Sequence, residues 1–341
     1  MAVVNPYSAV IAKAKAKYGH RLTVKDYAAL VKCESVGDIV RYLKTHTAYR
    51  RCLDKIGTDI HRGRLEEILR EDHFLNYLSL CRYNHSTSPV TGYLFRLMEI
   101  RELIHYLTLL SIGRPIDYLF TLPTYFDDHT EIPLAKLSDA HSYDEMLELL
   151  SDHGYRRVLE RFRPEHESAI NIAAISDAIE IYSLRELYND IAKVKNKKER
   201  SSLTALFDTL CDYNNYSRIM RLKRFYHLSS AAVKEHLLPF GTFTGKKLDA
   251  ILSGETYAEI RAAFADTKVG RLAQNIDIDD EMAVKGRYDR CRHELYFSSE
   301  PEVVLLAYYI VSETELKNII TIIEGIRYSL EPDSIRGMLI L

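Results

Sequence analysis

The sequence predicts an all-α protein built from three similar helical units. Helix-breaking residues are scarce, with 14 glycines and 9 prolines among 341 residues, which favours long helices over many short strands. Apolar residues recur with the 3.6-residue period of a helix, and no stretch alternates polar and apolar residues long enough to indicate a sheet. In addition, one pattern of helix start, apolar stripe and tail occurs three times along the chain.

The composition is that of a globular protein with a packed core, because 47% of the residues are hydrophobic and 28% are charged. A net charge of −2 argues against a protein that binds polyanions through its bulk charge. The longest apolar run, residues 303–311, is much shorter than the ~20 residues that a membrane-spanning helix needs. No signal peptide is expected, and the five widely spaced cysteines are expected to be reduced.

A first helix is expected at the N-terminus, where Asn5 can cap it and Pro6 can occupy its first position. One face of this helix is apolar, and Lys13, Lys15 and Lys17 lie mostly off it. A basic amphipathic helix can bind a membrane surface, or it can pack on the core with a solvated lysine face. The small, alanine-rich apolar face favours packing on the core. That face consists of Tyr7, Val10, Ile11, Ala14 and Tyr18.

The repeat is clearest at three helix starts, where Ser or Thr precedes an apolar run and an acidic residue follows three positions later. These pairs are Ser35 with Asp38, Ser142 with Glu145, and Thr256 with Glu259. The spacing is that of a capping box, and the second and third pairs have its glutamate. The first two starts continue into the similar segments 49–53 and 155–159, and the third continues more loosely into 270–272.

A long apolar stripe and a tail follow each start. The stripes are residues 100–107, 203–210 and 303–310, and the tails are 117–123, 232–239 and 334–341. We therefore predict three homologous helical bundles, residues 1–125, 126–240 and 241–341, because helices with one apolar stripe must pack on neighbours. Three similar units suggest a pseudo-threefold arrangement around an axis. An open solenoid is the alternative, although its repeats are usually shorter.

Motifs for catalysis or ligand binding fail on their spacing. Gly241 to Lys247 has too few residues between its glycines for a phosphate loop and lacks the following Ser or Thr, so it is interpreted as a linker turn. The acidic segment 277–281 lacks the length and central glycine of a calcium loop and is expected to start a helix. Residues 127–129 have no second histidine nearby, and neither HExxH nor GxSxG occurs. We predict no catalytic residue, no cofactor site and no metal site.

Basic residues are the remaining candidates. Residues 193–200 are interpreted as a solvated helix end, since the chain lacks the wider basic excess of a nucleic-acid-binding protein. A second group lies in a late helix of the second unit, and a comparable stretch of the first unit holds two more arginines. Such residues could face an acidic partner, with ordinary solvated charge as the alternative. The candidates are Arg96, Arg101, Arg218, Arg221, Lys223 and Arg224.

Several segments along the chain together carry a resemblance to a known family, although none is a strict signature alone. They are residues 14–23 with Asp26 and Tyr27, 59–63, 221–226, 237–241 and 318–328. In this order they resemble the C subunit of the V-type (archaeal-type) ATP synthases and ATPases, which is equivalent to the d subunit of the eukaryotic vacuolar enzyme. The resemblance runs from end to end of the chain.

The resemblance implies a funnel of three helical bundles with a central opening. It implies a non-catalytic central-stalk subunit without cofactors that couples the rotating shaft to the membrane rotor ring for proton or sodium transport. The implied partners are the shaft subunits and the proteolipid ring, with no nucleic acid, at the cytoplasmic face and in contact with the membrane only through the ring. Two other functions stay open: a helical hydrolase that uses residues such as His61 or Asp128, and a general helical scaffold or nucleic-acid adaptor.

Overall fold

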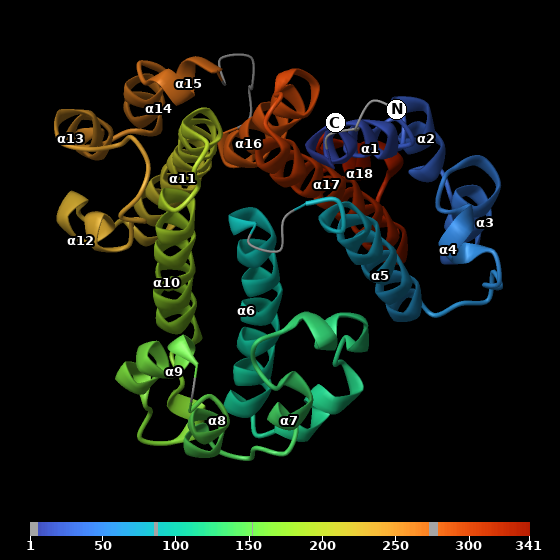
Figure 1. Cartoon of the computed structure of the whole chain (residues 1–341), viewed down its shortest axis with the longest axis horizontal. Coiled ribbons are helices and arrows are strands. Elements are labelled where there is room, and N and C mark those ends of the chain that lie inside the picture. The colour runs from blue at the N-terminus through green and yellow to red at the C-terminus, as the bar shows by residue number, and fades with distance from the viewer. Residues whose placement is uncertain (1–5, 85–87, 152, 273–278) are drawn as a thin grey trace. The chain divides into compact units, whose positions relative to one another are not determined.

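The computed structural model describes residues 6–84, 88–151, 153–272 and 279–341 (Figure 1). Its regular elements in these ranges are α-helices and short 3₁₀ helices, without a strand, so the all-α prediction is confirmed. Contacts divide the chain into a larger unit, residues 1–85 with 201–341, and a smaller unit, residues 86–200.

The larger unit contains the beginning and the end of the chain. Its helices are α1 (Pro6–Tyr18), α2 (Val24–Leu30), α3 (Val36–His46), α4 (Arg50–Leu53), α5 (Arg62–Cys81), most of α11 (Lys197–Tyr226), α12 (Ser230–Glu235), α13 (Lys246–Ser253), α14 (Tyr257–Ala265), α15 (Lys268–Leu272), α16 (Asp279–Phe297), α17 (Pro301–Arg327) and α18 (Pro332–Gly337).

The smaller unit holds the middle of the chain. Its elements are α6 (Pro89–Ser111), η1 (Pro115–Phe120), η2 (Thr124–His129), α7 (Leu134–Leu137), α8 (Tyr143–Leu149), α9 (Gly154–Leu159), η3 (Glu160–Phe162), η4 (Glu167–Ala169), α10 (Ile172–Ala192) and the first residues of α11. None of the described helices in either unit is long and apolar enough to cross a membrane.

The three predicted helix starts are confirmed, because each capping side chain accepts a hydrogen bond from the backbone three residues on. Ser35 accepts from Asp38 N at 3.1 Å to begin α3, and Ser142 accepts from Glu145 N at 3.2 Å to begin α8. Thr256 begins α14 with a complete capping box, since the Glu259 side chain also accepts from the Thr256 backbone.

One order of elements occurs three times along the chain: a short helix, a capped helix, another short helix, two long helices and a short tail. The series are α2 to α6 with η1, α7 to α12, and α13 to α18, with short 3₁₀ turns between some members. The boundaries 1–125, 126–240 and 241–341 stay a prediction, as does their arrangement around an axis.

Buried asparagines fasten the tails of the second and third series. Asn215 of α11 donates to Leu238 O at 3.0 Å and accepts from Leu238 N at 2.8 Å. Asn318 of α17 makes the same pair with Ile340, at 2.7 and 3.0 Å. Each side-chain amide thus satisfies backbone groups that the tail cannot pair within a helix.

One core of the larger unit joins the two ends of the chain. Buried residues of α2 to α5 pack against Leu316, Ile319, Ile322 and Ile323 of α17 and against the C-terminal tail. Helix α1 lies along α17 (Figure 1). Its residues Val10 and Ala14 are fully buried, so α1 is the core-packing helix that its small apolar face predicted.

A second core of the larger unit forms around the C-terminal half of α11. Tyr213, Tyr216, Ile219 and Met220 pack against buried residues of α12 to α16, and the rings of Tyr216 and Phe264 stack with centroids 3.9 Å apart. Helices α16 and α17 pack along each other.

The smaller unit is built on α6 and α10, which lie side by side (Figure 1). The carboxylate of Glu99 on α6 is buried there and accepts hydrogen bonds from Glu131 N and from the Tyr155 hydroxyl. Burial raises the pKa of Glu99. Tyr106 of the same helix donates to Ala140 O at 3.0 Å, which ties the loop before α8 to α6.

Candidate partner-binding interface

The basic residues predicted on α11 are mostly engaged within the larger unit. Lys223 donates its ammonium protons to Ser230 Oγ at 3.3 Å, to Gly254 O at 2.8 Å and to Leu252 O. These carbonyls lie at the C-terminal end of α13, where a helix leaves its last carbonyl groups unpaired and attracts cations. Lys223 is therefore a structural tie between α11 and α13.

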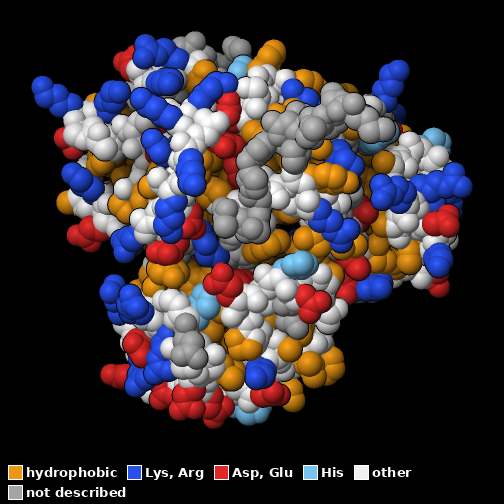
Figure 2. Space-filling model, viewed as in Figure 1, with side chains coloured by type: hydrophobic (Ala, Val, Ile, Leu, Met, Phe, Trp, Pro, Cys, Tyr) orange, Lys and Arg blue, Asp and Glu red, His pale blue; other side chains and the backbone are white. Residues whose placement is uncertain are grey.

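Its neighbours on α11 show a similar pattern. Arg218 donates to His236 O at 2.8 Å and so holds the end of α12. Arg224 is exposed, donates to the Tyr257 hydroxyl at 3.1 Å and lies over the rings of Phe225 and Tyr257. Arg221 is exposed. Figure 2 shows Lys and Arg side chains gathered over the part of the larger unit that holds α11 to α15.

The two candidates of the smaller unit differ from each other. Arg96 on α6 has a side chain only 14% exposed and pairs with Asp190 of α10 at 3.4 Å, so it contributes to the packing of these helices. Arg101 lies on the exposed surface of α6. Thus the structure groups the four α11 residues in one place, and it gives Arg96 a role inside its own unit.

A polar cluster missed by the sequence analysis surrounds Glu315 on α17. Its carboxylate accepts from Leu22 N at 2.7 Å and from the Tyr49 hydroxyl at 2.9 Å. Protein atoms surround this carboxyl group, and the loss of hydration raises its pKa to about 7. One side chain thereby holds the connection between α1 and α2, the start of α4, and α17.

Beside this cluster lies a cavity of about 120 Å³ that Lys17, Arg51, Asp72 and Glu315 help to line. Burial raises the pKa of Asp72, and burial together with Arg51 lowers the pKa of Lys17. Lys17 donates to Asn76 at 2.6 Å, and Asn76 donates to Asp72 at 2.8 Å. Lys17, Asn76 and Asp72 thus form one hydrogen-bonded series.

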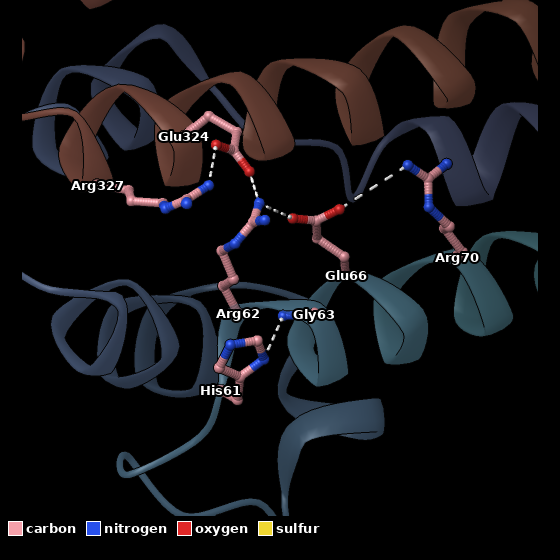
Figure 3. A network of polar contacts seen from close by, with 7 residues as sticks. All are labelled: His61, Arg62, Gly63, Glu66, Arg70, Glu324 and Arg327. Carbon is pink, nitrogen blue, oxygen red and sulfur yellow. Dashed lines mark hydrogen bonds and ion pairs between the residues drawn. The ribbon is translucent and has the colours of Figure 1, made fainter. Parts of the chain in front are cut away.

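The hydrolase hypothesis named His61 and Asp128, and neither lines this cavity. His61 caps α5, because its Nδ1 atom accepts from Gly63 N at 3.2 Å (Figure 3). Asp128 is an exposed residue of η2. The described residues contain no group of three or more His, Cys, Asp or Glu side chains arranged to hold a metal ion.

Ion pairs also join α5 to α17. Figure 3 shows Arg62 of α5 directed at Glu324 of α17, while Glu66 and Arg70 on α5 and Arg327 on α17 extend the network. The side chains of Arg62 and Glu324 are 32% and 30% exposed, so water screens their attraction. The contribution of this network to stability is therefore small.

A carboxylate from α11 binds the loop 241–247. Asp212 of α11 accepts from Thr242 N at 2.8 Å, from Phe243 N at 3.2 Å and from the Thr242 hydroxyl at 2.5 Å. Two of the backbone amides that a phosphate loop would offer to a ligand, those of Thr242 and Phe243, are therefore occupied by a carboxylate. Burial raises the pKa of Asp212 to about 6. The interpretation of this segment as a linker turn agrees with these contacts; the acidic segment 277–281 lies partly outside the described residues.

Three helix ends share a backbone turn that the sequence analysis also missed. The long helices α6, α11 and α17 are followed by Gly113, His227 and Ser329, with φ of 73°, 50° and 54°. The next amide returns to the helix: Arg114 N donates to Leu109 O at 2.9 Å, Leu228 N to Leu222 O at 3.3 Å, and Leu330 N to Gly325 O at 2.9 Å. This left-handed turn with a backward hydrogen bond ends a helix sharply.

The residue before each left-handed turn is apolar or aromatic and exposed. Ile112 is 62% exposed, Tyr226 is 65% exposed and Tyr328 is 64% exposed. Further exposed side chains accompany them, so we define three helix tips. They are the α6 tip (Ile112, Ile116, Leu119 and Phe120), the α11 tip (Phe225 and Tyr226) and the α17 tip (Tyr328 and Leu330).

Comparison with known proteins gives the family directly. The family model of the ATP synthase (C/AC39) subunit matches residues 10–338. The chain belongs to this family. The family resemblance drawn from the sequence is thereby confirmed, and the family is that of an accessory subunit of V-type ATPases and ATP synthases. A search of curated proteins found no match.

Proposed function

We propose that this C/AC39-family protein is the central-stalk rotor component that couples the rotating shaft of a V-type ATPase or ATP synthase to its membrane ring. The single observation that carries the proposal is the family match over residues 10–338. In this role the chain works at the cytoplasmic face, reaches the membrane only through the ring, binds no nucleic acid and needs no cofactor. The ion moved by the complex is a proton or sodium.

The structure supports a mechanical role. A rotor component must transmit torque without deforming, and close-packed helix interiors have low compressibility. The long helix α17 is buried along most of its length, and its neighbours come from the start of the chain as well as its end. Segments far apart in the sequence therefore brace one another.

Two measurements test the proposal. When the membranes that contain the complex are solubilised, the tagged chain is expected to purify with both shaft and ring subunits. Removal of the chain is expected to leave ATP hydrolysis running while ion transport driven by that hydrolysis is lost. Ion transport that stays fully coupled to hydrolysis in its absence would contradict the proposal.

A further inference from the structure

The three helix tips carry the same chemistry. Each has an exposed apolar or aromatic residue just before its left-handed turn, and each has an arginine within two positions of that residue. Arg224 lies over the ring of Phe225 and Arg327 lies over the ring of Tyr328, each with its guanidinium carbon 5.0 Å from the ring centroid. Arg114 at the α6 tip is 67% exposed and pairs with Asp117.

Exposed side chains of this kind are unusual for a surface that only meets water. On the 3₁₀ helix η1, the apolar residues Ile116, Leu119 and Phe120 are 56%, 55% and 82% exposed. Single exposed apolar residues are ordinary, but groups of them mark binding surfaces. Aromatic residues and arginine are also the types enriched at protein interfaces.

Repetition of the tips indicates the kind of partner. The tips follow the second long helix of each of the three series of elements, so one side-chain pattern is presented at three equivalent positions of the chain. A partner that offers one short element many times can meet each tip with the same contacts. A shaft that offers each surface once would instead favour three different patterns.

We propose that the α6, α11 and α17 tips are the elements with which this chain binds the membrane rotor ring. The inference rests on the proposed function, and it names the contact residues and their chemistry. Each repeated element of the ring would present an apolar side chain for the exposed apolar or aromatic residue of a tip. Arg224, one of the basic candidates found in the sequence, belongs to the α11 tip in this assignment.

The test uses the full chain and replaces the exposed residue at each tip, as Ile112→Ser, Tyr226→Ser and Tyr328→Ser, singly and together. Binding is measured to the purified detergent-solubilised ring and, separately, to the purified shaft subunits. We expect each single change to weaken ring binding about fivefold and the triple variant to weaken it about a hundredfold, because separate contacts add. Shaft binding is expected to stay unchanged.

The matched control is Val24→Ser, which replaces an apolar residue that is 71% exposed at the start of α2, away from any helix tip. It is expected to bind the ring like the unchanged chain. Circular dichroism and thermal unfolding check that the triple variant keeps its fold, as expected for substitutions at exposed sites.

The outcomes separate this inference from the proposed function. If the unchanged chain binds neither ring nor shaft, the proposed function fails. If the unchanged chain binds the ring and the folded triple variant binds it equally well, the function stands and the tip assignment is overturned. Loss of shaft binding alone, an equal loss in the Val24→Ser control, or tip-dependent binding to protein-free lipid vesicles would likewise overturn the assignment of the tips to the ring.

Discussion

Glu315 shows how much one buried carboxyl group can organise. Although the residue as a whole is partly exposed, its carboxyl group is surrounded by protein and accepts hydrogen bonds from Leu22 N and the Tyr49 hydroxyl. Both bonds are stronger when the acceptor is charged, yet the loss of hydration outweighs them and raises the pKa to about 7. Protonation of this group is therefore linked to the stability of the larger unit.

The sign of that linkage predicts a pH dependence. Because the pKa of Glu315 is raised to about 7 in the fold from an ordinary value of 4.5, the folded state holds the proton over a range where the unfolded chain has lost it. Its contribution therefore falls as the pH rises from about 4.5 to about 7, by at most ~3 kcal/mol. The Glu315→Gln variant should be the more stable protein at pH 8 and show a flatter pH profile in urea unfolding.

The control for this prediction is Glu148→Gln on the exposed surface of α8, which should keep the pH profile of the unchanged chain. A Glu315→Gln variant with the same slope between pH 5 and pH 8 as the unchanged chain would show that another group is responsible.

The residues with a left-handed backbone conformation at the helix ends give a second prediction. Ser329 has φ of 54°, a conformation that costs an L-residue roughly 1 kcal/mol and that glycine adopts freely. Ser329→Gly should therefore raise the unfolding free energy by about 0.5–1 kcal/mol, seen as a small rise in Tm. Gly113→Ala at φ of 73° should have the opposite sign. Equal signs for the two changes would argue against this account.

At the scale of whole elements, apolar packing rather than charge holds α17 to α5. The Arg62 to Glu324 pair is about one-third exposed on both sides, and such pairs contribute ~0–1 kcal/mol. Ile319 on the same helix is fully buried in the core with α2 to α5, and truncating such a side chain typically costs ~2–5 kcal/mol.

We therefore expect Ile319→Ala to lower the unfolding free energy several times more than Arg62→Gln. Thermal and urea unfolding of both variants measure the difference, and added salt should reduce the already small effect of Arg62→Gln. If Arg62→Gln proved as costly as Ile319→Ala, the ion-pair network would be the main link between these helices.

Sequence reasoning succeeded where the signal is local. Ser35, Ser142 and Thr256 cap their helices because the capping pair lies within four residues. The helix against which each apolar stripe packs is not encoded locally, because every stripe has a similar apolar face. The packing of α17 on α2 to α5 could therefore not be predicted from the sequence. The carbonyl groups that Lys223 binds at the end of α13 leave no trace in sequence, and its place at a partner interface stays a prediction.

The helix tips were missed for a related reason. In a sequence, Ile112, Tyr226 and Tyr328 are apolar or aromatic residues at the ends of long helices, so nothing local marks them as exposed. Their exposure depends on the helix ending at the next residue, and only Gly113 signals such an ending. Histidine and serine adopt this conformation much less often than glycine, so the repeated turn became visible only in three dimensions.

At the scale of the molecule, the chain closes on itself within the larger unit. Helix α3 and its neighbours α2, α4 and α5 find their core partners in α17 and in the tail residues Ile335 and Leu339. Contacts between residues so far apart in sequence cost loop-closure entropy, but they make the stability of the first helices depend on the last ones.

This dependence can be measured by hydrogen exchange. The double variant Ile335→Ala with Leu339→Ala removes two buried tail side chains and should lower the unfolding free energy of the larger unit by about 4 kcal/mol. Amides of α2 to α5 should then exchange faster although they lie at the other end of the sequence, while residues 86–200 keep their protection. Met338→Ala, which truncates a neighbouring side chain that is 51% exposed, should change neither region. Faster exchange confined to the tail itself would mean that the first helices hold together without the end of the chain.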